Sequence, residues 1–261
     1  MNAMGSRPPA GKKGAIDKAL AVLEALAGHD RLADIAAATG LPKSTVHRIL
    51  QTLIGHGFAV SGGAGEYRPG PRVLTLAGQV MARWDPAQAA TPLLRALHDR
   101  TGLTVHLAML AGDEAVYVEK IEGRLPYQLA SRVGMPLRLH CTAIGKAILA
   151  ALAEEEARVI LDRAGMERHT PRTVTDPDTL LAQLRQIRAR GFAVDDEENE
   201  PGVRCVGAAV RDHLGRVTGA VGVSMLVFER TLEEAEALGP LVVETAEAVS
   251  RALCRRAASR R

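Results

Sequence analysis

The sequence predicts an α+β protein with two domains, and three observations support this prediction. Residues 15–55 carry three consecutive segments with helical periodicity, followed by two short strand candidates around a glycine-rich turn. From residue 91 onward, strand candidates joined by short turns alternate with helical segments. The chain has 261 residues, of which 47% are hydrophobic and 24% charged, a composition typical of a globular protein with room for two modest domains.

Hydropathy, cysteine usage and charge indicate the environment of the chain. No apolar run approaches the roughly 20 residues that a membrane-spanning helix requires, and the first residues lack the apolar stretch of a signal peptide. We therefore expect residues 1–14 to be a disordered tail and the protein to be cytoplasmic, with no membrane partner. The cysteines Cys141, Cys205 and Cys254 are widely spaced, which agrees with a reducing compartment. The net charge is +3, and the basic excess in residues 1–90 fits either a polyanionic partner or chance.

The first domain begins with three predicted helices. The first starts at Ala15, and its apolar residues recur at i, i+3, i+4 and i+7 spacing. This apolar stripe consists of Ile16, Ala19, Leu20, Leu23, Leu26 and Ala27. The second helix is expected over Leu32–Thr39, with Gly40 as its C-terminal stop. The third is expected over Pro42–Gly55, because proline is tolerated in the first helical turn.

The third helix has an apolar face and a polar face. Its inward stripe consists of Val46, Ile49, Leu50 and Leu53. The residues left facing outward are Ser44, Thr45, His47, Arg48, Gln51 and Thr52. Strand candidates at 58–60 and 66–68, around the turn Ser61–Gly65, complete the element order of a winged helix-turn-helix.

Three residues carry the helix-turn-helix pattern. Ala36 lets the second and third helices cross closely, and Gly40 permits a left-handed turn between them. Val46 packs the third helix on its partner. The alternative is an ordinary three-helix core whose polar residues are solvated surface.

A helix-turn-helix places its third helix in the major groove of DNA. Arg48 and Gln51 have donor patterns suited to guanine and adenine edges, whereas Lys43, Ser44 and Thr45 are expected to hold phosphates. The expected DNA-binding residues are Lys43, Ser44, Thr45, His47, Arg48, Gln51 and, on the wing, Arg68.

A helical stretch at residues 72–90, with an expected break at Pro86, separates the two domains. The expected organisation is a winged helix-turn-helix at 15–76, a linker helix at 77–90 and a second domain at 91–261.

The second domain is predicted to combine helices with an antiparallel sheet. The sequence Asp176-Pro177-Asp178 is a strong helix start, since aspartate caps the helix and proline suits its first position. The expected helices cover residues 92–101, 142–153, 154–164, 177–190 and 232 to the C-terminal end. The expected strands cover residues 104–110, 115–121, 127–132, 206–211 and 217–226.

The last two strands place small residues on one face. With a four-residue turn at His213–Arg216, their pairing follows from the register. The expected pairs are Cys205 with Ser224, Gly207 with Gly222, and Ala209 with Ala220. A sheet face with so little bulk meets either a close-packed helix or a cavity, and the sequence leaves both open.

Several segments in order along residues 15–255 carry a resemblance to a known family. They read AIDKALAVLEAL, LADIAAATGLPKSTVHRILQTLIGHGF, TGLTVHLAMLAGDEAVYVEKIEG, PLRLHCTAIGKAILAAL and RGFAVDDEENEPGVRCVGAAVRDHLGRVTGAVGVS. Through them the chain resembles the IclR family of transcription regulators. The resemblance implies a GAF-like effector-binding domain after the linker helix, and a homodimer or dimer of dimers on partly palindromic promoter DNA. It also implies control by a small organic or aromatic acid. Repressors and activators both occur, and we expect a repressor.

The resemblance further implies a pocket in the second domain. Its residues come from a helix start, an acidic segment and the last strands, with two apolar walls. The expected effector-binding residues are Met135, Leu137, Ala143, Ile144, Asp195, Cys205 and Ser224. The backbone N–H groups of the helix that starts at Thr142 would attract an anion such as a carboxylate, unless the threonine merely caps the helix.

Two other functions use residues near this pocket. A cysteine-dependent hydrolase could be built from His140, Cys141, Cys205 and Asp195, and the same side chains could bind a metal in a metal- or redox-responsive regulator. No recognisable motif sets a nucleophile beside a base, and no C-x-x-C or H-x-x-x-H spacing is present. We therefore expect a regulator and not an enzyme, with no catalytic residue, metal or cofactor.

Overall fold

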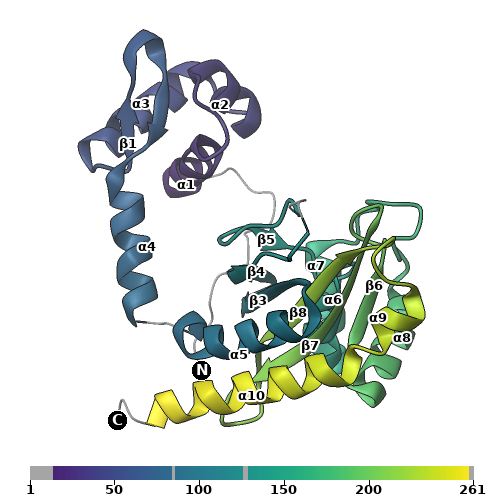
Figure 1. Ribbon diagram of the computed structural model, residues 1–261. Helices are drawn as coiled ribbons and strands as arrows, with labels where there is room; N and C mark the ends of the chain where they lie inside the picture. Colours follow the sequence, from purple (N-terminus) through teal and green to yellow (C-terminus); the bar gives the residue numbers. More distant parts are fainter. Residues whose placement is uncertain (1–13, 84–85, 126–128, 259–261) are drawn as a thin grey trace. The chain divides into compact units, whose positions relative to one another are not determined.

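The computed structural model describes residues 14–83, 86–125 and 129–258, so the tail expected at 1–14 lies outside the described residues except for its last member. The described chain divides into two compact units, one ending before Pro86 and one beginning there (Figure 1). Within these ranges no helix is both long enough and apolar enough to span a membrane.

The N-terminal unit has the expected order of elements, three helices, a hairpin and a fourth helix. Its elements are α1 (Ala15–Leu26), α2 (Leu32–Thr39), α3 (Lys43–Gly55), β1 (Ala59–Ser61), the short 3-10 turn η1 (Gly63–Gly65), β2 (Tyr67–Pro69) and α4 (Pro71–Arg83). The strands β1 and β2 pair antiparallel, and an isolated bridge joins Arg31 to Glu66. This arrangement is a winged helix-turn-helix.

The core of this unit corrects the predicted stripe of α1. Val22 and Leu26 are buried against α2 and α3, whereas Ile16 is 76% and Leu20 is 53% exposed. The helix carries two adjacent apolar stripes, and periodicity alone does not say which one meets the neighbouring helices. One apolar edge of α1 is therefore left without cover in the described chain.

The turn between α2 and α3 is built as expected. Gly40 caps α2 in a left-handed conformation with φ of +67°, which a residue with a side chain adopts only with strain. Pro42 is the N-cap of α3 and not its first helical residue, because its ψ of 141° is extended. Ala36 and Val46 are both buried at the helix crossing.

The C-terminal unit combines one sheet with helices. Its elements are α5 (Pro86–Thr101), β3 (Thr104–Ala111), β4 (Glu114–Ile121), β5 (Pro136–Leu137), α6 (Ala143–Ala151), α7 (Glu154–Ala164), α8 (Pro177–Arg190), β6 (Ala193–Asp196), β7 (Val203–Arg211), β8 (Val217–Leu226), α9 (Leu232–Glu236) and α10 (Gly239–Ala258). The sheet has the order β5-β4-β3-β8-β7-β6, and every neighbouring pair is antiparallel.

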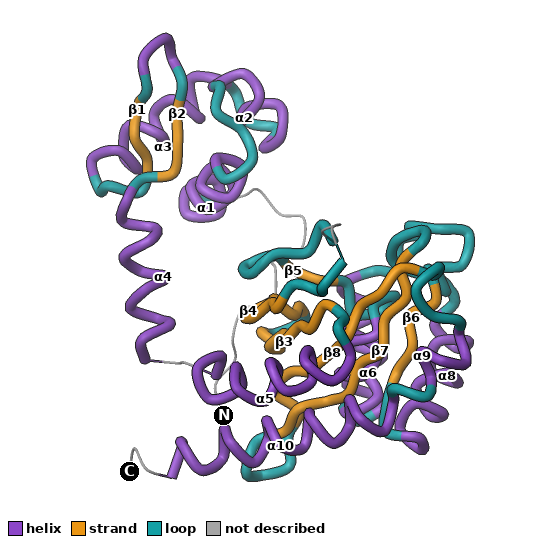
Figure 2. The backbone as a smooth tube through the Cα atoms, viewed as in Figure 1, coloured by secondary structure: helices purple, strands orange, loops and turns teal. Residues whose placement is uncertain are grey.

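Helices cover both faces of this sheet (Figure 2). On one face α5 and α10 contact the large side chains of β3, β7 and β8, including Leu107, Val223 and Met225. On the other face α6, α7 and α8 form a second core with the small residues Ala108 and Ala220. The predicted pairing of β7 with β8 is confirmed, with Cys205 opposite Ser224 and Gly207 opposite Gly222, as is Ala209 opposite Ala220.

Several predicted bounds are wrong. Residues 129–132 form no strand, and the edge strand β5 lies further on (residues 127 and 128 are outside the described chain). The strand β6 was not expected, since two of its four residues are acidic. The helix expected from Pro92 begins at Pro86, because Pro92 is accommodated inside α5. The helix expected from Leu232 is broken before Gly239, where a Cβ atom would lie 2.4 Å from the Phe192 ring.

Candidate functional site

The polar face of α3 is exposed, as the sequence predicts. Lys43, Ser44, His47, Arg48 and Gln51 are exposed, and Thr45 is half-buried. Val46 and Leu50 on the opposite side are fully buried, so they fix the rotation of α3 on the unit. The side chains at the exposed positions project from one end and one face of a helix whose backbone is held by a core. A helix held in this way can enter the major groove of DNA without a rearrangement of the unit that carries it.

The wing contributes one cation with a local partner. Arg68 is exposed, and its guanidinium lies 3.3 Å from the Glu66 carboxylate on the same hairpin. This pair lies in water, where ion pairs are weak. A phosphate can therefore compete with Glu66 for Arg68.

A hollow lies on the α6 side of the sheet in the C-terminal unit. It has about 520 Å³ of free space, counted together with solvent at its mouth. Its lining comes from β3, β4, β5, β7, β8, the segments on either side of β5 and the segment after β6. The lining residues are His106, Tyr117, Leu129, Ala130, Ser131, Met135, Pro136, Leu137, Arg138, Thr142, Asn199, Glu200, Val203, Cys205 and Ser224.

A chain of polar contacts runs across the floor of the hollow. The Cys205 thiol donates to the Ser224 hydroxyl at 3.1 Å, and this hydroxyl lies 3.4 Å from His106 Nδ1. His106 Nε2 lies 2.8 Å from the Ser131 hydroxyl. Burial, with a smaller contribution from Lys120, lowers the pKa of His106 to about 3, so the ring is neutral near pH 7.

Lys120 fixes the segment that forms one wall. Its ammonium group donates to the backbone carbonyls of Leu129 and Ser131 at 2.9 and 2.7 Å, and it pairs with Glu122 at 2.9 Å. These bonds hold residues 129–131 over β4. This wall is therefore held in part by a side chain, that of Lys120, which does not itself line the hollow.

Four of the seven predicted effector residues line the hollow, namely Met135, Leu137, Cys205 and Ser224. The other three, Ala143, Ile144 and Asp195, are buried beside it. A Cβ atom at Gly207 would lie 2.8 Å from the Ala143 carbonyl carbon, and one at Gly222 would lie 2.9 Å from Ile144 Cγ1. The small residues that β7 and β8 place on one face are therefore covered by α6 at Gly207 and Gly222. At Cys205 and Ser224 the same face lines the hollow.

Asp195 belongs to a buried charge cluster. It accepts the backbone N–H groups of Glu198 and Asn199 at 2.7 and 3.3 Å, and Lys146 pairs with the Glu198 carboxylate. Burial raises the pKa of Asp195 to about 7 and raises that of Glu198. The hydrogen bonds that Asp195 accepts therefore shape the loop that carries Asn199 and Glu200 to the hollow.

The start of α6 is capped by its own threonine. Thr142 Oγ1 accepts the Gly145 N–H at 3.0 Å and donates to the Arg138 carbonyl at 2.5 Å. The capping alternative thus accounts for one of the N–H groups of the helix start. Arg138 lines the hollow beside it and supplies a full positive charge.

Sequence reasoning missed several lining residues. His106 and Tyr117 come from β3 and β4, and their rings lie 5.0 Å apart. A histidine within the apolar run Thr104–Leu110 was the available signal, because such a residue on a strand requires a polar partner. Asn199 and Glu200 follow β6, whose position was not predicted, and so gave no signal.

The arrangement favours binding over catalysis. Burial raises the pKa of Cys141 to about 12 and raises that of Cys205 above the usual range of a thiol, so neither is a thiolate near neutral pH. The hydrolase alternative needs a thiolate beside a base. The hollow instead combines apolar walls and neutral hydrogen-bonding groups with one basic residue, Arg138, and one acidic residue, Glu200, which suits a small polar ligand.

Comparison with known families gives matches over both units. The model described as "IclR helix-turn-helix domain" matches residues 15–62, and that described as "Bacterial transcriptional regulator IclR C-terminal" matches residues 78–251. The chain is similar to the HTH-type transcriptional regulator XynR of Escherichia coli, with 40% identity over 81% of this chain and 85% of that protein. It is also similar to the E. coli HTH-type transcriptional repressor AllR, with 32% identity over 95% of this chain and 94% of the repressor.

Solved structures give the same result. The crystal structure of the Thermotoga maritima IclR matches 91% of this chain and 98% of its own, with a TM-score of 0.69 and 34% identity. An IclR homologue from Microbacterium hydrocarbonoxydans, solved in complex with 4-hydroxybenzoate, matches 92% of this chain and 99% of its own. Its TM-score is 0.76, and its identity of 24% supports the fold alone.

Proposed function

Because the chain belongs to the IclR family of bacterial transcriptional regulators, we propose that it binds promoter DNA through α3 and the wing and that a small acid in the hollow controls this binding. The DNA-binding role rests on the exposed polar face of α3, which carries Lys43, Arg48 and Gln51 opposite a buried apolar stripe. The target is double-stranded, partly palindromic promoter DNA, read by Arg48 and Gln51 and held at its phosphates by Lys43, Ser44, Thr45 and Arg68. His47 lies on the same face and faces the groove beside them.

The effector is a small carboxylate or aromatic acid. The hollow offers the guanidinium of Arg138 and the hydroxyl of Ser224 to polar groups, and Met135 and Leu137 to an apolar body. Its histidine is neutral, so Arg138 is the residue of the lining that can pair with an anion, and the carboxylate of Glu200 favours an orientation that keeps the acid group away from it. The complex of the Microbacterium homologue with 4-hydroxybenzoate is an example of an acid of this size bound by a protein of this fold.

The protein acts as a homodimer or a dimer of dimers. Exposed apolar residues on α1 and α4 support this, since Ile16, Leu20, Leu74 and Val80 are all more than half exposed. Large apolar side chains without cover are typical of surfaces buried between subunits. A two-fold dimer carries two copies of α3 to two half-sites, which matches a partly palindromic target.

The regulator is a repressor and not an enzyme, and it acts on the chromosome in the cytoplasm. The repressor assignment is supported by AllR, which is named a repressor and aligns along nearly the whole chain. Effector binding shifts the population between arrangements of the two DNA-binding heads and so changes their match to the half-sites.

A two-step experiment tests this proposal. Duplexes selected from a random library by the full chain define the preferred site, and fluorescence anisotropy then gives its affinity with and without 4-hydroxybenzoate and related acids. We expect selection of an inverted repeat and at least a ~5-fold change in affinity for one acid. Selection without sequence enrichment contradicts the DNA assignment. An affinity that every acid leaves unchanged contradicts the effector assignment.

A further inference from the structure

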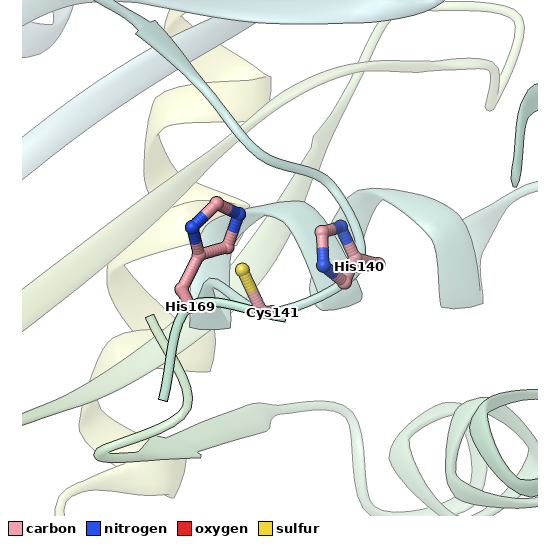
Figure 3. A group of neighbouring side chains, drawn as sticks. All are labelled: His140, Cys141 and His169. Atoms are coloured by element: carbon pink, nitrogen blue, oxygen red, sulfur yellow. The ribbon is translucent and has the colours of Figure 1, made fainter. Parts of the chain in front are cut away.

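Three potential metal ligands converge beside the hollow, outside the set that lines it. His140 and Cys141 directly precede α6, and His169 lies in the loop between α7 and α8. One ligand atom from each of the three lies within 4.8 Å of the other two. Figure 3 shows the Cys141 sulfur between the two imidazole rings. His169 is 28 positions after Cys141 in the chain, so its approach to His140 and Cys141 is a product of the fold.

The spacing is close to that of a bound metal. Two zinc ligands with bond lengths of about 2.1 Å for nitrogen and about 2.3 Å for sulfur lie roughly 3.6 Å apart at a tetrahedral angle. A spread of 4.8 Å closes to this value through small rotations of the side chains. The ring centroids of His140 and His169 are 5.9 Å apart, so the rings can turn their nitrogens toward a common centre.

A hydrogen bond orients the imidazole of His140, and the imidazole of His169 has a buried nitrogen without a partner. His140 Nε2 lies 3.0 Å from the Glu167 carbonyl oxygen, which accepts its proton and leaves a lone pair on Nδ1. Such a backbone partner is typical of histidines that bind metals. Among the described residues, His169 Nε2 is a buried ring nitrogen with no hydrogen-bond partner. A buried polar atom without a partner is unfavourable, and a metal ion would satisfy it.

The loop that carries His169 is held in place by other bonds. Thr173 Oγ1 accepts the His169 N–H at 3.1 Å and donates to the Glu198 carbonyl at 2.6 Å. Cys141 is fully buried, and its thiol lies 3.7 Å from the amide oxygen of Asn199, which lines the hollow. The three ligands therefore form a pre-organised group at the border of the hollow.

We propose that His140, Cys141 and His169 bind one Zn²⁺ ion per chain, with a water molecule or a ligand oxygen as the fourth donor. Binding releases the thiol proton of Cys141 to solvent, and the ion is then held by one thiolate and two neutral imidazoles. The site ties the loop between α7 and α8 to the start of α6. It is independent of the DNA-binding proposal, which uses no residue of this cluster.

Metal titration of the full chain tests the site. The protein is stripped with a chelator, and Zn²⁺ is then titrated in competition with a chromophoric chelator. We expect one tightly bound Zn²⁺ per chain and a rise in the melting temperature. In a parallel titration with Co²⁺ we expect a near-ultraviolet thiolate-to-cobalt charge-transfer band. Absence of stoichiometric Zn²⁺ binding overturns the proposal.

Matched variants assign the ligands. We expect Cys141→Ser to remove the charge-transfer band and His169→Gln to weaken Zn²⁺ binding at least ~10-fold. Cys254→Ser and His213→Gln change the same residue types outside the cluster and should bind as the unmodified chain does. Near-ultraviolet circular dichroism of the stripped proteins checks folding, and His169→Gln provides the test if Cys141→Ser does not fold. A Cys141→Ser protein that folds and keeps the band, or a folded His169→Gln protein with unchanged affinity, contradicts the assignment.

Discussion

Cys205 lies opposite Ser224 in the pairing of β7 with β8, and its thiol donates to the Ser224 hydroxyl at 3.1 Å. Two residues further along, Gly207 lies opposite Gly222, and there the sheet is in contact with the first turn of α6. On this sheet face, Cys205 and Ser224 line the hollow, whereas Gly207 and Gly222, the next pair along the same face, are covered by α6. This border determines which of the predicted residues face the hollow.

The α3 surface predicts two kinds of effect on DNA binding. Arg48→Ala should lower the affinity for the selected duplex by ~1–3 kcal/mol and leave a scrambled duplex little changed, because a bidentate base contact is lost. Lys43→Ala should weaken both duplexes alike and reduce the salt dependence by about one phosphate contact. Anisotropy titrations over a salt series measure both, with Lys18→Ala on α1 as the control. Equal losses on both duplexes for Arg48→Ala would refute the distinction.

Arg138 predicts how the hollow recognises an acid. Arg138→Ala should weaken binding of a carboxylate effector at least ~10-fold, whereas Arg138→Lys should retain part of it, because a charged hydrogen bond is worth about 1.5–3 kcal/mol. The methyl ester of the same acid should bind both variants and the unmodified chain with similar, weak affinity. Isothermal titration calorimetry gives these constants. An ester that binds as tightly as the acid would show that Arg138 does not hold the carboxylate.

His106 predicts an acid-sensitive stability. Its pKa is about 3 in the folded chain against 6.5 for an ordinary histidine, so below pH 6.5 the unfolded chain takes up a proton that the folded chain does not. Above pH 6.5, His106 therefore does not make the free energy of unfolding depend on pH. Below pH 6.5, its preference for the neutral form lowers the free energy of unfolding by up to about 1.4 kcal/mol per pH unit as the pH drops toward 3. Urea denaturation between pH 4.5 and 7 should show a shallower slope for His106→Gln than for the unmodified chain. Identical slopes would contradict a buried, neutral His106.

The buried pair of Lys146 and Glu198 predicts a large loss of stability. Lys146→Met should lower the free energy of unfolding by about 3 kcal/mol or more, because the Glu198 carboxylate remains buried without its partner. Arg158→Met breaks the exposed pair with Asp178 in the same unit and should have little effect. Urea denaturation at pH 7 compares the two variants. Similar stability for both would indicate that water reaches Glu198.

The exposed apolar residues of α4 predict the oligomeric state. Val80→Asp should shift the protein toward the monomer, because an added charge is costly at an apolar contact between subunits. Gln79→Asp adds the same charge at a neighbouring exposed polar position and should leave the mass unchanged. Light scattering after size-exclusion chromatography measures both. A Val80→Asp protein with the mass of the unmodified chain would place the contact elsewhere.

Local signals predicted most of the fold. The capping sequence at Asp176 and Gly191 gave α8 its bounds, and Asp176 accepts the Thr179 N–H as expected. The expected four-residue turn gave the correct pairing of Cys205 with Ser224, although the turn itself is longer. Arg211 pairs with Val217, and a register shift between Val210 and Arg211 restores the expected register. Such features depend on neighbours in the chain, so the sequence contains them.

Features that depend on distant partners were not predictable in the same way. The choice of Val22 over Ile16 in α1 is made by α2 and α3, and both stripes are apolar. Ile144 was expected in the pocket, but Gly222 allows it to pack directly on the sheet. The convergence of His169 on Cys141 requires the loop between α7 and α8, for which the sequence has no motif.

The contact of α6 with Gly207 and Gly222 limits how the hollow can change in size. At Gly207 the sheet meets backbone atoms of Ala143 and Ile144, so no rotamer change creates space there, whereas at Gly222 it meets the side chain of Ile144. In the wall formed by residues 129–138, Lys120 holds Leu129 and Ser131 by hydrogen bonds, whereas Gly134, Met135 and β5 are bonded to the backbone of β4. We therefore expect a longer acid to be accommodated at residues 129–131. For the proposed effector site, we therefore expect substitutions at residues 129–131 to change the length of the acid that the hollow accepts.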